Sequence, residues 1–356
     1  MNYVLSCSGI ISPVAIHLLN SGKKVTVVTY SEDVKKFCIA MNIKFIDYEI
    51  IKPGFEFTHR PTKLFRRVIN VIIAIKTLKN RLDGLIKTMH FSEEDNFHLL
   101  TSWIAYDNFY LAKELSKNGK GSVYFSGINW QERKACKWKF NYAFFGQVFL
   151  GQLLKLFLGL DLFVCESVNN LKFAIDEKFM RKNNIIKNCP EKPFVEFMVD
   201  VITNNQISRK QYENMLIGEG SGITNRIDYN SLNDVYKCIA DLPLEIVMKK
   251  HPVAGKNIPK VNKIYEELFG DCEEFPSYIP AELVLRNIKR NVIAVSSTPL
   301  IAASQLKHIS AISLLELVGW YDETKKNNMK NDLMKMSKNK IIFVKTFEQL
   351  KQTLTQ

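Results

Sequence analysis

The chain has 356 residues, too many for one ordinary hydrophobic core, and its length predicts two domains. Its 46% apolar and 24% charged residues are typical of a folded globular protein. The net charge of +13 favours polyanionic partners, such as nucleic acid, acidic lipid headgroups or phosphorylated glycolipids. None of the seven cysteines forms a Cys-x-x-Cys pair, which argues against structural zinc and disulfide frameworks and indicates reduced thiols in a cytosolic compartment.

The first fifty residues alternate between strand and helix patterns. Apolar or β-branched runs predict strands at 3–7, 24–30 and 43–48, and the segments between them predict helices at 13–20 and 32–41. This β-α-β-α-β order predicts a parallel sheet with right-handed crossovers. No basic segment precedes the first apolar run, so we interpret it as a strand rather than a signal peptide.

The segment 60–87 is basic and has apolar residues at helical spacing. Such a helix suits a membrane surface, and it equally suits an ordinary surface helix packed on a core. No nucleic-acid-binding motif accompanies the charge, so we expect no nucleic acid partner. The apolar positions are Leu64, Val68, Val71, Ile72, Ile75 and Leu78.

The middle of the chain adds a helix at 109–118, a strand at 122–125 and one long apolar run at 144–164. Four polar or charged residues interrupt that run: Gln147, Gln152, Lys155 and Asp161. A membrane-spanning helix tolerates few such residues at its centre, so the run predicts a buried or interfacial helix leading into a strand at 160–165.

Polar residues and prolines gather between 182 and 212 and predict a domain boundary there. We expect an acceptor-side domain at 1–205 and a donor-binding domain at 206–356. The second domain has strand patterns at 214–218, 244–248, 291–295, 309–313 and 340–344, and helix patterns at 232–240, 281–288, 299–306 and 347–354. The fold class is therefore α/β, with two Rossmann-like parallel-sheet domains facing a cleft, where ligands bind at the carboxyl ends of strands.

Three loops follow strands of the second domain: GEGSG at 218–222, KKHP at 249–252 and SSTP at 296–299. Because they follow strands of one parallel sheet, we expect them to meet at one edge. The hydroxyls and N–H groups of SSTP, at the start of a helix, suit an anion, although a simple Ser/Thr cap has the same pattern. A lone His-Pro pair is more often a surface turn.

The run SYIPAELVLRNIK at 277–289, between KKHP and AVSSTPLIAAS, resembles bacterial sialyltransferases of glycosyltransferase family 52. These are the lipooligosaccharide sialyltransferases, and bacterial polysialyltransferases share related motifs. The resemblance covers residues 215–304. It implies a GT-B fold and the transfer of sialic acid, or a related nonulosonic acid, from a CMP-activated donor.

The resemblance also implies roles for individual residues. His251 would lie by the donor phosphate and assist the departing CMP, and Glu282 would hold the ribose hydroxyls. Ser296 and Ser297 would hold the phosphate, and Glu219, the only carboxylate in GEGSG, would be the base. The other predicted donor-binding residues are Gly218, Lys250, Pro252 and Pro280.

The chain departs from the family at one motif. Where the family has two acidic residues and a glycine after a strand of the first domain, this sequence has Phe125, Ser126 and Gly127. The loop SCSGIIS near the N-terminus is expected to face the cleft, and it lacks the Gly-x-Gly-x-x-Gly pattern of dinucleotide-binding folds.

These inferences together predict an inverting transferase in which a protonated histidine and serine donors meet the charge of the leaving CMP. No Asp-x-Asp occurs, so we expect catalysis without a metal or other cofactor. The expected partners are a CMP-sugar, a glycan acceptor such as lipopolysaccharide, lipooligosaccharide or capsule, and the inner face of the cytoplasmic membrane. The oligomeric state is left open.

Two other functions are compatible with the same sequence. A glycan- or membrane-binding protein that keeps the fold after losing its base would explain the missing acidic motif. A GT-B epimerase is a further alternative, but such enzymes act on UDP-sugars, and the SYIPAE motif argues against this one. Hydrolysis of CMP-sialic acid without an acceptor would distinguish the transferase from the binding protein.

Overall fold

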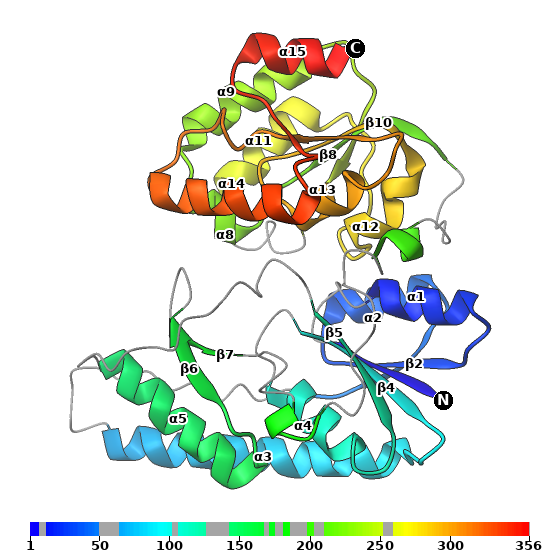
Figure 1. Ribbon diagram of the computed structural model, residues 1–356, viewed down its shortest axis with the longest axis vertical. Coiled ribbons are helices and arrows are strands. Elements are labelled where there is room, and N and C mark those ends of the chain that lie inside the picture. Colours follow the sequence, from blue (N-terminus) through cyan, green and yellow to red (C-terminus); the bar gives the residue numbers. More distant parts are fainter. Residues whose placement is uncertain are drawn as a thin grey trace. The chain divides into compact units, whose positions relative to one another are not determined.

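The computed structural model describes residues 1–6, 12–49, 64–101, 106–125, 142–166, 171–174, 181–185, 198–202, 210–251 and 259–355. The chain divides into two compact units, Met1–Phe194 and Val195–Gln356 (Figure 1). The boundary predicted after residue 205 therefore falls inside the second unit.

Unit 1 contains a five-stranded parallel sheet with the order β3-β2-β1-β4-β5. This sheet confirms the predicted parallel arrangement of the first three strands. Its strands are β1 (Asn2–Ser6), β2 (Val25–Thr29), β3 (Lys44–Asp47), β4 (Asn96–Thr101) and β5 (Lys120–Phe125). The helices between them are α1 (Ser12–Asn20), α2 (Glu32–Ala40), α3 (Leu64–Met89) and α4 (Tyr106–Leu115).

Helix α3 is the predicted basic helix, and it packs on α4 and α5. The buried positions repeat every three or four residues, which places them on one face of the helix. They are Val71, Ile75, Leu78, Leu82, Leu85 and Met89. On the described part of the opposite face, Ile69 and Ile73 are exposed.

The long apolar run of the middle segment forms α5 (Tyr142–Leu158), followed by β6 (Phe163–Glu166). Leu154 and Leu158 of α5 are buried in the core of unit 1. Strand β6 does not join the main sheet, but pairs antiparallel with β7 (Leu171–Ala174). None of the helices in the described ranges is both long and apolar enough to cross a membrane.

Unit 2 contains a second five-stranded parallel sheet, with the order β12-β11-β10-β8-β9. Two parallel sheets, one per unit, confirm the α/β class with two Rossmann-like domains. The strands are β8 (Tyr212–Ile217), β9 (Ile246–Lys249), β10 (Ile288–Ala294), β11 (Ser310–Ser313) and β12 (Ile342–Phe343). The helices and helical turns are α8 (Ser221–Thr224), α9 (Tyr229–Ala240), α11 (Pro259–Phe269), α12 (Ala281–Val284), η4 (Leu285–Asn287), α13 (Thr298–Ala303), α14 (Glu323–Ser337) and α15 (Phe347–Thr355).

The order of the strands in unit 2 creates a switch point between β8 and β10. The chain leaves β8 for β9 on one side and then crosses to β10 on the other side of β8. In open α/β sheets, ligands bind outside the carboxyl ends of the strands at such a point, because the two connections diverge there. The loops that follow β8 and β10 are therefore where a ligand site of this unit is expected.

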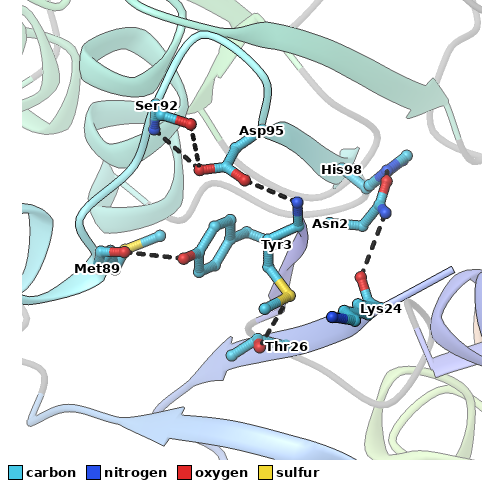
Figure 2. Close-up of polar contacts among 9 residues, drawn as sticks. Asn2, Tyr3, Lys24, Thr26, Met89, Ser92, Asp95 and His98 are labelled. Atoms are coloured by element: carbon cyan, nitrogen blue, oxygen red, sulfur yellow. Dashed lines mark hydrogen bonds and ion pairs between the residues drawn. The ribbon is translucent and has the colours of Figure 1, made fainter.

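In unit 1, a polar network lies at the amino ends of β1 and β4 (Figure 2). Ligands of α/β sheets bind at the opposite, carboxyl ends of the strands. The Asp95 carboxylate accepts hydrogen bonds from the Ser92 N–H and hydroxyl at 2.9 and 3.0 Å, and pairs with the Met1 amine at 2.7 Å. Nε2 of His98 lies 3.1 Å from Asn2 Oδ1, and burial lowers the pKa of His98 to about 4. We regard these contacts as structural.

Candidate active site

The carboxylate of Glu219 joins the loops that follow β8 and β10. Its Oε1 accepts a hydrogen bond from the Val295 N–H at 2.7 Å and from the Ser296 N–H at 3.2 Å. These residues stand about 75 positions apart in the chain but are adjacent here, because β8 and β10 are neighbouring strands. The GEGSG and SSTP loops therefore meet at the switch point of the sheet.

His251, in the loop after β9, packs against the same GEGSG loop. A Cβ atom built on Gly220 would lie 2.9 Å from Cε1 of the imidazole and 3.0 Å from Nε2. A larger residue at position 220 would therefore force the imidazole to shift, because real Cβ atoms essentially never come within 3.0 Å of a neighbouring atom. Burial, and secondly the charge of Lys249, lower the pKa of His251 below its ordinary value. Both effects favour the neutral imidazole.

Glu219 itself is almost fully buried, with 2% of its surface exposed. Burial raises the pKa of Glu219 to about 8, against the opposite effect of its two backbone hydrogen bonds. The protonated form therefore predominates at neutral pH. The hydroxyl of Tyr265, on α11, accepts a hydrogen bond from the Glu219 N–H at 3.1 Å and lies where a Cβ on Gly218 would clash, at 2.9 Å.

The SSTP loop at 296–299, here called the serine loop, is already hydrogen-bonded to Glu219 at its start. Val295 and Ser296 already donate their N–H groups to Glu219. Ser297 is the N-cap of α13, and among the described residues its side chain makes no capping hydrogen bond. The alternative of a simple side-chain cap is therefore not what the geometry shows. Helix α13 has only six residues.

Glu282 is the second residue of the short helix α12, and Pro280 is the N-cap of this helix. Its side chain is buried, and burial raises the pKa of Glu282, while a backbone hydrogen bond and the charge of Lys249 act in the opposite direction. The Nζ of Lys249 donates to the Ser277 carbonyl at 3.3 Å and so connects β9 to the segment that leads to Glu282.

The two neighbouring lysines have different environments. Lys249 is 3% exposed, whereas Lys250 forms an ion pair with Glu274 at 2.9 Å on a partly exposed surface. From the sequence, both lysines are expected to raise the positive potential near His251, but only Lys250 is placed in the donor site, and Tyr265 is not predicted. A lysine at the end of the apolar strand IVMK is unusual, and its position could have predicted a buried role for Lys249. No local sequence pattern predicts the contact of Tyr265 with Glu219, because the two residues lie 46 positions apart.

Of the predicted site residues, four come together directly: Gly218, Glu219, His251 and Ser296. Pro252, Ser126, Gly127 and most of the SCSGIIS loop lie outside the described residues. Among the side chains that the structure describes, no three His, Cys, Asp or Glu residues gather in a way that could hold a metal ion.

No known family model matches the chain, and no curated protein sequence matches it. Among solved structures, the spinosyn rhamnosyltransferase SpnG complexed with thymidine diphosphate is 12% identical, with a TM-score of 0.47 over 99% of this chain and 90% of that one. The E. coli heptosyltransferase WaaC with ADP-2-deoxy-2-fluoro heptose is 12% identical, with a TM-score of 0.39 over 100% and 99% of the chains.

The UDP-GlcNAc 2-epimerase from Neisseria meningitidis bound to UDP-GlcNAc is 11% identical, with a TM-score of 0.39 over the full length of both chains. These likenesses are too distant to assign a function to this chain.

Proposed function

We propose that this protein is a glycosyltransferase that uses a nucleotide-activated sugar, and more specifically a CMP-activated sialic acid or related nonulosonic acid. The main support is the meeting of three loops at the switch point of unit 2. Glu219 binds the loop after β10, and His251 packs against Gly220 in the loop after β8. Loops that carry a histidine, a carboxyl group and two serines thus meet at the position where an α/β sheet binds its ligand.

The donor proposal rests on charge. A CMP-sugar carries a single phosphate, whose growing negative charge can be met by a protonated imidazole and hydroxyl donors. Burial and Lys249 lower the pKa of His251, and a bound phosphate would raise it, so we propose that donor binding protonates His251. We propose that no metal or other cofactor takes part.

The acceptor hydroxyl needs a base, and we propose Glu219 for this role. Its Oε1 is held by two N–H groups, so the second oxygen would take the proton. A raised pKa is common in general bases, since it increases the affinity of the carboxylate for the proton. Direct attack by the activated hydroxyl would invert the anomeric centre.

The other donor-binding roles follow the resemblance to family 52. Glu282 would hold the ribose hydroxyls, and Ser296 and Ser297 would bind the phosphate mainly through their hydroxyls, because the Ser296 N–H already donates to Glu219. We include Gly218, Lys250, Pro252 and Pro280 in the donor site.

Unit 1 is proposed as the acceptor side, with a glycan of lipopolysaccharide, lipooligosaccharide or capsule as the substrate class. We propose a cytoplasmic enzyme that rests on the inner membrane through the exposed face of α3. The net charge of +13 and the exposed Ile69 and Ile73 support this location.

One observation favours a second candidate function. Glu219 is almost fully buried, and its carboxyl group joins the loop after β8 to the loop after β10 by hydrogen bonds. This structural role requires no proton transfer. If that is its only role, the protein binds an activated sugar or glycan without turning it over.

Calorimetric titration of the purified protein with CMP and with UDP tests the donor proposal. We expect CMP to bind measurably more tightly than UDP. Equal affinity for the two would contradict a CMP-specific donor site, and no binding of either nucleotide would contradict the glycosyltransferase.

A further inference from the structure

Lys249 is a buried cation inside the proposed site. It is the last residue of β9, where it pairs in register with Ile217 of β8, and its carbonyl accepts a hydrogen bond from the Gly218 N–H at 2.9 Å. Only 3% of its surface is exposed. Burying an ammonium group is costly, and such groups persist in proteins where their charge has a use.

The ammonium group connects two of the segments that build the site. Its Nζ donates to the Lys250 carbonyl at 3.0 Å and to the Ser277 carbonyl at 3.3 Å. The first carbonyl belongs to the loop that carries His251. The second belongs to the segment that leads through Pro280 to Glu282. Lys249 therefore holds these two segments together.

The charge of Lys249 also acts on His251 and Glu282 in those segments. Beside the larger effect of burial, it helps to lower the pKa of His251, and it opposes the rise that burial causes in the pKa of Glu282. Lys250 forms an ion pair with Glu274 at 2.9 Å. Lys249 is therefore a source of positive potential near His251 and Glu282.

We propose that Lys249 is the electrostatic and positioning residue of the site: it supplies a fixed positive charge for the phosphate of a bound nucleotide and fixes the His251 loop against the Glu282 segment. The inference deepens the proposed function and rests on it, because the ligand phosphate is that of the nucleotide donor.

The test compares Lys249→Met, which removes the charge at similar side-chain length, with Lys249→Arg, which keeps it. Lys263→Met is the matched control, because it removes one charge from an exposed position on α11 that pairs only with Glu267 among the described residues. Calorimetry measures the affinity of each protein for CMP and for cytidine, which has no phosphate.

We expect the wild type to bind CMP more tightly than cytidine. Lys249→Met should lower the affinity for CMP on the order of tenfold, as expected for losing one nearby charge in a partly buried site. It should lower the affinity for cytidine by a smaller factor, because the lost hydrogen bonds to the Lys250 and Ser277 carbonyls loosen the segment that leads to Glu282. Lys249→Arg should keep most of the CMP preference, and Lys263→Met all of it.

The second readout is the pKa of His251, followed by NMR. It should lie below the ordinary histidine value in the wild type and should rise in Lys249→Met. If Lys249→Met does not fold, the wild-type measurement decides, since a pKa at or above the ordinary value would overturn the proposal.

The outcomes separate this inference from the proposed function. A wild type that does not distinguish CMP from cytidine contradicts the donor site as a whole. A wild type that prefers CMP, with Lys249→Met keeping the same preference, overturns only the role of Lys249. Equal losses of CMP and cytidine binding would show a purely structural lysine and also overturn it.

Discussion

At the scale of single residues, the site depends on close contacts that leave little room for change. The imidazole of His251 lies against Gly220, and the hydroxyl of Tyr265 lies against Gly218. The carboxyl group of Glu219 takes both hydrogen bonds from the serine loop. Small substitutions here should change activity far more than stability. They displace the reacting side chains only slightly, but a small displacement is enough to disturb the geometry that the reaction needs.

His251→Ala tests whether the His-Pro pair is catalytic or only a turn. A surface turn would tolerate the change, typically within about half a kcal/mol of stability. If His251 donates to the leaving phosphate, the rate should fall on the order of 100- to 1000-fold, with weaker CMP binding and normal folding. The measurement is the initial rate with CMP-sialic acid and a glycan acceptor, beside a melting curve. Near-normal turnover would mean that the pair is a turn.

Glu219→Gln separates the two roles of Glu219, the hydrogen bonds that join two loops and the proposed role as a base. The amide oxygen can still accept both N–H groups, so the variant should fold, but it cannot take a proton, and turnover should fall on the order of 100- to 10,000-fold. In the wild type, the rate should increase as pH rises toward the pKa of about 8, because only the ionised carboxyl acts as a base.

The same carboxyl makes a prediction for stability. Glu219 binds its proton more tightly in the folded state than in the unfolded state, where its pKa is near 4.5. Protonation of Glu219 therefore contributes fully to the free energy of unfolding below about pH 4.5, and this contribution is lost as pH rises through about 8. Melting curves should show this loss in the wild type and not in Glu219→Gln. Identical pH profiles of the two proteins would contradict the raised pKa.

Gly220→Ala tests the packing of the imidazole. The new methyl group would lie about 2.9 Å from Cε1 of His251, so the ring must move. We expect a folded protein with clearly reduced turnover. Gly84→Ala is the control, because a Cβ there meets nothing within 4 Å in α3, and alanine should stabilise the helix slightly. Equal activities of the two variants would show that the imidazole position does not matter.

At the scale of elements, the alternation of strands and helices could be predicted because each element repeats its own pattern. The strand VTVVT and the stripe of α3 are local signals, and the structure confirms both. The predicted helix 281–288 ends early, as α12 and the 3-10 turn η4, and β10 begins at Ile288. Residue 288 pairs with Tyr212 of β8, a tertiary contact that no local pattern announces.

The exposed face of α3 makes a prediction about membranes. Ile69 and Ile73 are exposed there, Lys76 lies over the ring of Phe157, and Leu156 of α5 is 73% exposed. Apolar side chains with nearby cations suit an anionic lipid surface. Ile69→Glu combined with Ile73→Glu should weaken sedimentation with anionic vesicles, and added salt should weaken wild-type binding.

The control for this experiment is Ile39→Glu on α2, an apolar position that is 69% exposed, more than Ile69 or Ile73. It should bind vesicles like the wild type. Equal wild-type binding to neutral and anionic vesicles would contradict the electrostatic attraction, and equal losses in the two variants would contradict the assignment to α3.

At the scale of the whole molecule, two parallel sheets could be predicted from the sequence, but the order of their strands could not. Strand order decides which loops meet, and it places β8 between β9 and β10. The three loops were predicted from their motifs, whereas the hydrogen bonds of Glu219 and the burial of Lys249 arise only on folding. Chemistry-bearing residues leave a local signal, and the residues that support them do not.

The most direct test of the account is the release of CMP from CMP-sialic acid by the purified protein, with and without a lipooligosaccharide acceptor and in the presence of a metal chelator. We predict release that increases with acceptor, is unaffected by the chelator and is abolished in His251→Ala. CMP binding without any release would favour the non-catalytic alternative, and release from UDP-sugars alone would contradict the account.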